Sequence, residues 1–437
     1  MFLYIKKHIF IFACFVLSSS LFSQSSFEIM NNKKQVKIPF DLVSNLIIVP
    51  VKLNGVELSF LLDTGVRETI LFNVSRVDSL MLNNVKTITV KGANDVRVTA
   101  LKSKDNLLEV VDLKSTAHNI YVAFNQDTNL SAYLGEEIHG ILGYHLFKDF
   151  VIEISYTKKV VKVMKKGTYK NKWNRYTAVD LTFLKGKPYV VSKMRGENRK
   201  LLLDTGMSDG VWMFKEDSLS ITKYGYYKDF LGMSVSGEIL GKRSKIEELN
   251  FAGERFKDVK ISYPDPVTLP KEVKGFKDRA GSIGGELLKR FTIVLDYPNS
   301  KMYLKPNSHL KDSFYYNKSG IILRQEGEAV SNNNNNELLK NLEADNFISF
   351  VDLTYLLIPE FIIDVVREGS PAALAGLREN DVLLEVNGVK AFYFTLKKIN
   401  RHFYDEDDTL VQLKIERNGR VLKKEFTLKS PLKKNAK

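Results

Sequence analysis

The middle of the chain repeats itself. The pentapeptide Leu-Leu-Asp-Thr-Gly at residues 61–65 recurs at residues 202–206, an offset of 141 residues (from 63 to 204). A glycine-led block at residues 143–150 recurs at the same offset as residues 284–291, with Gly, Leu, Lys and Phe identical. A given tripeptide occurs by chance about once in 8,000 positions at ~5% per residue type. Two copies with matching neighbours therefore indicate an internal duplication.

Each copy reads as β structure. An Asn-Gly pair at residues 54–55 separates the apolar segments 46–53 and 56–62, a strong hairpin signal. The second copy repeats this pattern over residues 188–203, around Arg195-Gly196. No long segment with helical period precedes residue 310. We expect both halves of the repeat to be mainly β.

Composition limits the possible classes. The chain has 437 residues, of which 44% are hydrophobic and 27% are charged, so disordered, collagen-like and membrane-bundle classes are excluded. Lys and Arg number 65 against 51 Asp and Glu, which gives a net charge of +14. Because these charges are spread along the chain, we expect no nucleic-acid partner. Cys14 is the single cysteine, so an intrachain disulfide or a thiolate metal cluster is excluded.

The first 23 residues have the pattern of a secretory signal peptide. Lys6 and Lys7 precede an apolar stretch at residues 9–17, and polar residues follow. The stretch is short for a membrane span, which takes ~20 residues, although a membrane anchor is the alternative. Lipid attachment at Cys14 is less favoured because it leaves an apolar core of six residues. We expect cleavage near Ser23, a periplasmic or secreted protein and no further membrane-spanning segment.

Two carboxylates follow matching apolar strands. A duplicated fold suggests a pseudo-two-fold axis, near which Asp63 and Asp204 would face each other. Two carboxylates that close cannot both ionise, so one would act as base while the other acts as acid. That arrangement can activate a water molecule for peptide hydrolysis without a metal or a covalent intermediate.

The neighbours of both aspartates fit this arrangement. We expect the hydroxyls of Thr64 and Thr205 to bind the backbone of the opposite loop. Glycine allows close backbone approach, which suggests a supporting role for four glycines: Gly65, Gly206, Gly143 and Gly284. The last two would let a strand pass under the aspartate loops.

Residues 34–305 resemble the aspartic peptidases of the retropepsin/pepsin superfamily, the best-known case of a proton shared by two carboxylates. The resemblance implies two pseudo-symmetric, barrel-like β lobes, over the ranges 34–165 and 166–305, with a cleft between them. It also implies that Asp63 and Asp204 are the catalytic pair. Three departures stand out: Val-Arg-Glu at 66–68 after the first loop, Met-Ser-Asp at 207–209 after the second, and Ser282 at an expected apolar position. The substrate-covering flap is not assigned, and residues 91–94 and 232–234 lie in suitable intervals.

Residues 315–430 resemble a bacterial PDZ domain. The resemblance rests on Gly-Ser-Pro-Ala-Ala-Leu-Ala-Gly-Leu at residues 369–377, on a helix predicted over 396–403 and on a closing hairpin over 410–428. Such domains bind extended peptides by adding a strand to a sheet edge. We expect residues 319–323 to supply the first strand. We also expect the usual glycine-bearing loop of the peptide groove to be either missing or replaced by residues 357–360. Packing against the peptidase lobes is the alternative role.

An asparagine-rich segment interrupts this domain. Residues 332–336 are five consecutive asparagines, which we interpret as a surface insertion near 331–337.

Other chemistries lack a signal in the sequence. The six histidines are scattered, and His139 and His145 lack a metal-binding spacing. We expect no metal and no cofactor. The sequence predicts a monomeric, exported aspartic endopeptidase that cleaves protein or peptide substrates and whose PDZ-like domain docks a substrate or a peptide ligand. The alternative is a non-catalytic periplasmic binding protein that uses the PDZ groove.

Overall fold

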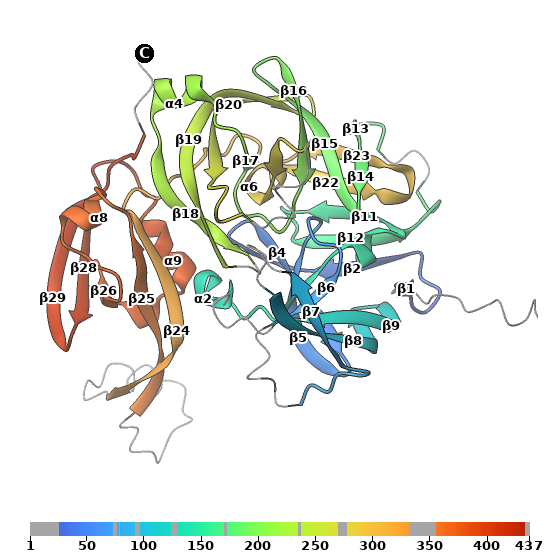
Figure 1. Cartoon of the computed structure of the whole chain (residues 1–437), viewed down its shortest axis with the longest axis horizontal. Coiled ribbons are helices and arrows are strands. Elements are labelled where there is room, and N and C mark those ends of the chain that lie inside the picture. The colour runs from blue at the N-terminus through green and yellow to red at the C-terminus, as the bar shows by residue number, and fades with distance from the viewer. Residues whose placement is uncertain are drawn as a thin grey trace, which may run out of the picture.

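The computed structural model describes residues 26–72, 77, 79–91, 97–123, 130–169, 173–234, 237–269, 278–332 and 355–432. These residues form mainly β structure in two lobes and a C-terminal domain (Figure 1). The predicted signal peptide, residues 1–23, lies outside the described residues.

Lobe 1 is built on a nine-stranded sheet with the order β1-β9-β6-β10-β5-β4-β8-β7 and β3 beside β4. Its strands are β1 (Glu28–Ile29), β3 (Asp41–Val43), β4 (Leu46–Leu53), β5 (Val56–Leu62), β6 (Thr69–Leu71), β7 (Lys86–Lys91), β8 (Arg97–Val110), β9 (Leu113–Val122) and β10 (Gly140–Leu142). The sheet thus starts before residue 34, where the sequence placed the beginning of the lobe.

Lobe 2 has the order β14-β15-β16-β21-β17-β20-β19-β18. Its strands are β14 (Thr182–Leu184), β15 (Lys187–Met194), β16 (Glu197–Leu203), β17 (Val211–Met213), β18 (Tyr227–Ser234), β19 (Gly237–Phe251), β20 (Glu254–Pro264) and β21 (Gly281–Ile283). With the additional pairings β9–β8 in lobe 1 and β15–β19 in lobe 2, equivalent strands are neighbours in both lobes. The pairs β4–β5 and β15–β16 are the hairpins expected from the sequence. Their turns use positive φ angles, at Asn54 and Gly55 in lobe 1 and at Arg195 and Gly196 in lobe 2.

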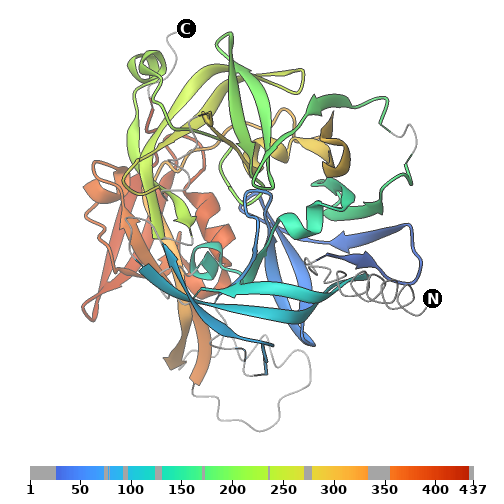
Figure 2. The same ribbon diagram turned by 45° about the vertical axis from the view of Figure 1, so that its right-hand side comes forward.

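A third sheet joins the lobes through its central pair β11–β22, with the order β13-β23-β22-β11-β12-β2. Its strands are β2 (Gln35–Pro39), β11 (Phe150–Ser155), β12 (Val160–Lys165), β13 (Thr177–Asp180), β22 (Phe291–Asp296) and β23 (Lys301–Pro306). Ile154 pairs with Ile293, and Ile152 pairs with Leu295, so the offset of 141 maps each pair onto the other. One apolar core runs through both lobes. Figure 2 shows lobe 1 below and lobe 2 above, with the C-terminal domain at the left.

The helices in the described part of the lobes are short. They are α2 (Leu130–Leu134), α3 (Tyr144–Phe147), α4 (Ser218–Tyr224), α6 (Gly285–Leu288) and the 3₁₀ turn η2 (Tyr297–Asn299). Among the described residues, no helix is both long enough and apolar enough to cross a membrane.

The C-terminal domain has the sheet order β24-β25-β26-β28-β29, with β27 beside β26. Its elements are β24 (Ile321–Asn332), β25 (Tyr355–Val366), α8 (Pro371–Leu374), β26 (Val382–Val386), β27 (Val389–Lys390), η3 (Ala391–Tyr393), α9 (Leu396–His402), β28 (Leu410–Arg417) and β29 (Arg420–Thr427). Ser370 caps α8 by accepting a hydrogen bond from the Ala373 amide, 3.2 Å away. The predicted helix, which is α9, and the predicted closing hairpin, which is β28–β29, lie where the sequence placed them.

Two of the segments singled out in this domain are residues 357–360 and the asparagine-rich segment. The prediction that residues 357–360 form a loop in place of the glycine-bearing one is wrong. These residues belong to β25, where Pro359 pairs with Glu328 and Ile358 pairs with Ala329. Pro359 is tolerated because the register shifts beside it, between Glu326 and Glu328. Asn332 is the last residue of β24, and the rest of the asparagine-rich segment lies outside the described residues.

Candidate active site

The two Asp-Thr-Gly turns follow equivalent strands, β5 and β16. Each of these two strands lies parallel to another strand of its own lobe: β5 to β10, and β16 to β21. The Asp63 amide donates to the Leu142 carbonyl at 3.0 Å, and the Asp204 amide donates to the Ile283 carbonyl at 2.9 Å. Backbone hydrogen bonds therefore fix the start of both turns independently of their side chains.

The threonines join the two turns. Thr64 Oγ1 donates to the Leu203 carbonyl at 2.6 Å and accepts from the Thr205 amide at 3.1 Å. Thr205 Oγ1 donates to the Leu62 carbonyl at 2.8 Å and accepts from the Thr64 amide at 3.0 Å. These four buried hydrogen bonds cross the pseudo-two-fold axis and hold the loops in contact.

The two carboxyl groups lie against each other's loops. A Cβ atom at Gly65 would lie 2.8 Å from Asp204 Oδ1, and a Cβ at Gly206 would overlap the Asp63 carboxyl group. The Gly65 amide donates to Asp63 Oδ1 at 2.6 Å, and the Gly206 amide donates to Asp204 Oδ1 at 3.2 Å. Side chains larger than hydrogen at either glycine would displace a carboxyl group.

The later glycines lie directly beneath the loops. A Cβ at Gly143 would collide with the Val66 carbonyl, and one at Gly284 would lie 2.5 Å from the Met207 carbonyl. The next amides donate to the same carbonyls: Tyr144 to Val66 at 3.0 Å, and Gly285 to Met207 at 2.7 Å. The structure thus brings all eight predicted site residues together.

The surroundings give the two aspartates different affinities for a proton. Burial raises the pKa of Asp63 well above its ordinary value, and the charge of Asp204 raises it further. Burial also raises the pKa of Asp204, but the positive charges of Arg279 and Lys187 oppose that rise. A single proton held by the pair therefore favours Asp63, and the negative charge favours Asp204.

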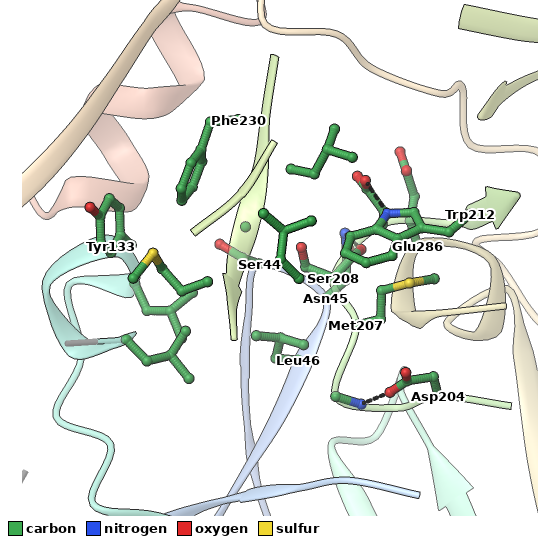
Figure 3. Close-up of a pocket in the computed structure, with 18 of the residues that line it drawn as sticks. Ser44, Asn45, Leu46, Tyr133, Asp204, Met207, Ser208, Trp212, Phe230 and Glu286 are labelled. Atoms are coloured by element: carbon green, nitrogen blue, oxygen red, sulfur yellow. Dashed lines mark hydrogen bonds between the residues drawn. The ribbon is translucent and has the colours of Figure 1, made fainter. Parts of the chain in front are cut away.

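Both aspartates line a pocket of about 900 Å³. Its walls come from both lobes and from the C-terminal domain, including Leu46 and Tyr133, Met207 and Phe230, and Ile321 and Lys397. Tyr133 and Phe230 stack with their ring centroids 5.3 Å apart. Figure 3 shows Asp204 at one end of this pocket and these two rings at the other.

Two cations near the pair have no counterpart in lobe 1. Lys187 begins β15, and Arg279 lies just before β21; both line the pocket. At the offset of 141 their positions in lobe 1 hold Leu46 and Ile138. The repeat could not reveal these residues, since they break it. The one available signal was Ser282, whose hydroxyl accepts a hydrogen bond of 2.5 Å from Arg279.

A buried charge network adjoins the second loop. Asp209 accepts hydrogen bonds from Arg243 Nη1 at 2.6 Å and from Trp212 Nε1 at 2.9 Å. Lys260 Nζ lies 3.6 Å from Asp209 and 2.8 Å from Glu286. Although burial opposes ionisation, these cations hold the pKa of Asp209 far below its ordinary value. The network fixes the loop after Asp204 to β19 and β20.

The flap candidates differ in what the structure describes. Residues 92–94 lie outside the described residues, whereas Gly232 and Met233 lie near the end of β18 and line the pocket.

The C-terminal domain turns its edge strand towards lobe 1. β24 is an edge of its sheet, and α2 packs against it. Tyr133 donates a hydrogen bond of 2.7 Å to Asp364, and a Cβ at Gly135 would lie 2.7 Å from the Leu396 Cβ. On the other side, Arg367 stacks on the Tyr227 ring of lobe 2, 4.5 Å from its centroid. Lobe 1 therefore covers part of the surface to which a peptide strand would add.

Metal binding has no support in the described part of the chain, where no three His, Cys, Asp or Glu side chains are grouped closely enough to hold an ion.

Two similar β lobes, each contributing one Asp-Thr-Gly loop to a shared pocket, define an aspartic peptidase architecture. Comparison with protein families agrees. Residues 49–146 match an aspartyl protease family, and residues 362–417 match the PDZ domain family. The chain thus carries an aspartyl protease domain and a C-terminal PDZ domain. The aspartyl protease match contains Asp63 and Gly143 but ends before Asp204. Asp204 is related to Asp63 by the internal repeat, and the threonine hydrogen bonds join their two loops. A comparison with curated proteins gives no match.

Proposed function

We propose that the chain is an aspartic endopeptidase in which Asp63 and Asp204 activate a water molecule. The observation that carries this proposal is the placement of each carboxyl group against the glycine of the opposite loop, at the wall of a large pocket. The ionised Asp204 accepts a proton from the water as its oxygen attacks the peptide carbonyl carbon. Asp63 donates its proton to the carbonyl oxygen, which gives a neutral tetrahedral diol.

Collapse of the diol reverses the two roles. Asp204 passes its proton to the leaving nitrogen, the C–N bond breaks, and Asp63 recovers a proton from a diol hydroxyl. The pair returns to its starting state with one proton, and the products are an amine and a carboxylic acid.

The PDZ domain in this proposal forms part of the substrate-binding surface. Ile321, Ile322 and Leu323 line the same pocket as the aspartates. A substrate long enough to cross the pocket would contact both domains. Both aspartates come from one chain, so we expect a monomer to be active. The N-terminal leader supports export to the periplasm or the medium, and the N-terminus of the recovered protein, near residue 24, tests this.

The proposal is tested by incubating the purified mature chain with a mixed peptide library and identifying products by mass spectrometry. We expect cleavage by the wild type and none by Asp63→Asn or Asp204→Asn. Asp180→Asn is a control that removes an exposed carboxylate, 80% accessible, and should cleave like the wild type. Cleavage that persists in both dyad variants would refute the proposal.

The PDZ match also supports the alternative, a binding protein without hydrolytic activity. In that case removal of residues 306–437 would abolish peptide binding, whereas Asp63→Asn and Asp204→Asn would leave it unchanged.

A further inference from the structure

The loop that carries Asp63 is tied at successive points to the segment that follows β10. Backbone hydrogen bonds join residues 63–66 to residues 142–144. Beyond them lies a contact between side chains, in which His145 Nε2 is 3.3 Å from Glu68 Oε2. Because a carboxylate can only accept a hydrogen bond, His145 Nε2 carries the proton and donates it. This contact fixes the far end of the loop, directly before β6.

The surroundings strengthen this hydrogen bond. His145 is buried and Glu68 is half-buried, so water competes with the pair only in part. The hydrogen bond from His145 is the largest cause that holds the pKa of Glu68 below its ordinary value, so Glu68 accepts it as a carboxylate. The titratable groups that face the pair are Arg67, Lys102, His118 and Tyr144.

Lobe 2 connects the same two positions with other side chains. The offset of 141 maps Glu68 onto Asp209 and His145 onto Glu286. Both residues are acidic there, and Lys260 bridges them, with its Nζ 3.6 Å from Asp209 and 2.8 Å from Glu286. The two lobes therefore share the connection itself and not a particular pair of residue types.

Glu68 and His145 can affect catalysis only through the loop. The described residues that line the pocket include neither of them, so they do not reach a substrate there. The Asp63 carboxyl group must stay against Gly206 to share its proton with Asp204. A displacement of about 1 Å in such a group can cost about a hundredfold in rate.

We propose that Glu68 and His145 are positioning residues for Asp63, whose hydrogen bond holds the loop at residues 63–68 so that the Asp63 carboxyl group stays within reach of Asp204. This inference rests on the proposed peptidase function and adds two residues that act through the loop. Side chains behind a reacting group commonly set its position in this way.

Two substitutions of Glu68 separate its hydrogen bond from its charge. Glu68→Ala and Glu68→Gln both remove the charge, but only Gln keeps an oxygen that accepts from His145. For one cleaved peptide we expect Glu68→Ala to lower kcat at least about tenfold and to keep KM within about twofold. Glu68→Gln should recover most of the lost kcat.

Asp312→Ala is the matched control. Asp312 follows β23, lies 3.0 Å from His309 Nδ1 and has a side chain that is 37% exposed, as is that of Glu68. It should keep the wild-type kcat. A similar loss of kcat in Asp312→Ala and Glu68→Ala would overturn the proposal.

The pH profile of kcat/KM distinguishes positioning from a loss of folded protein. Carboxyl groups that move apart interact less, so the bell-shaped profile of Glu68→Ala should be narrower than that of the wild type. Loss of folded protein would lower the profile without changing its width. An unchanged kcat in Glu68→Ala, or a reduced rate with an unchanged width, would overturn the positioning role and leave the peptidase intact.

His145→Leu removes the donor of the same hydrogen bond. Combined with Glu68→Ala, it should lower kcat no further than either single change, because both break one contact. Losses that multiply in the double variant would overturn the pair.

If the wild type cleaves no peptide, the proposed function fails, and the Asp63 carboxyl group itself reports its position. In full-length protein with isotope-labelled aspartate carboxyl carbons, the Asp63 signal is identified by NMR as the one missing in Asp63→Asn. It should titrate at lower pH in Glu68→Ala than in Glu68→Gln, because a displaced carboxyl group is less buried and lies farther from Asp204. Equal titration in the two variants would overturn the inference.

Discussion

Asp63 and Asp204 share the same local sequence and differ in what surrounds them. Asp204 lies near Arg279 and Lys187, whereas the matching positions of lobe 1 hold Ile138 and Leu46. The charge of Lys187 lowers the pKa of both carboxyl groups, whereas the charge of Arg279 lowers that of Asp204, which favours a proton on Asp63.

Asp63→Asn should stabilise the protein as pH rises. The folded-state pKa of Asp63 is raised above 3.8, so the folded protein holds a proton that the unfolded chain releases. The wild type is therefore most stable, with respect to this group, below the unfolded pKa, and it loses that stability as pH rises through the folded pKa. Asn carries no charge and avoids the loss.

The melting temperature of Asp63→Asn, measured by calorimetry across pH, should exceed that of the wild type by an increment that grows with pH and then levels off. A constant difference at every pH would contradict the raised pKa.

Gly206→Ala should impair the site directly, because the added methyl group overlaps the Asp63 carboxyl group. Since displacement of a catalytic group by about 1 Å can cost about a hundredfold, we expect kcat/KM to fall by at least that factor. Gly210→Ala is the matched control, since a Cβ there has its nearest neighbour at 3.6 Å. An unchanged rate in Gly206→Ala would mean that the carboxyl group lies elsewhere during catalysis.

Among the elements, the repeat predicted the hairpins and the location of both aspartate loops. It could not predict that β10 and β21 insert beside β5 and β16, because parallel pairing leaves no local signal in three-residue strands. The helices α3 and α6 span four residues each, too few to show a helical period. Residues 357–360 were expected to form a loop, but they belong to β25, where a register shift accommodates Pro359.

Thr64→Val and Thr205→Val should weaken the contact between the lobes. Each change removes one donor and leaves a buried amide of the other loop without its acceptor. Loss of about 1–3 kcal/mol in the free energy of unfolding is expected for each variant. The double variant should lose less free energy of unfolding than the two single variants together, because the four hydrogen bonds depend on one another.

Urea unfolding measures these losses. Thr222→Val, an exposed hydroxyl on α4, should stay within about 0.5 kcal/mol of the wild type. Additive losses in the double variant would show that the two threonines act independently.

Asp209→Asn should destabilise lobe 2, because it leaves Arg243 and Lys260 with less negative charge in a buried network. Breaking such a pair typically costs about 3–5 kcal/mol. The folded-state pKa of Asp209 is lowered, so its contribution is present above the unfolded value of 3.8 and is lost as pH falls below it.

The stability deficit of Asp209→Asn, followed by urea unfolding, should therefore narrow in acid. Asp180→Asn breaks an exposed pair and should cost less than about 1 kcal/mol. A deficit for Asp209→Asn that widens as pH falls would contradict the network.

At the scale of the whole molecule, the PDZ domain completes the pocket. Its presence could be predicted from residues 369–377, but its position could not. The contacts that place it are single pairs, such as Tyr133 with Asp364 and Arg367 with Tyr227, and neither pair belongs to a recognisable sequence pattern. A pocket lined by both lobes and the PDZ domain can therefore be recognised only from the folded structure.

Gly135→Ala should loosen the contact between lobe 1 and the PDZ domain. The new Cβ would lie 2.7 Å from the Leu396 Cβ of α9, closer than packed carbon atoms approach. Hydrogen exchange at the amides of α2 should therefore accelerate, while exchange in β5 stays slow. Gly196→Ala introduces similar backbone strain at a turn with open space and should leave α2 unaffected. Unchanged exchange in α2 would show that this contact does not restrain the helix.

In the mechanism that we propose, one proton shared by Asp63 and Asp204 drives peptide hydrolysis. The pH dependence of kcat/KM for a single cleaved peptide, measured for the wild type and for Asp204→Asn, tests it most directly. We expect a bell-shaped profile for the wild type, because activity requires one carboxyl group protonated and the other ionised. For Asp204→Asn we expect no measurable rate. A wild-type profile without an alkaline limb, or a rate that survives the substitution, would contradict it.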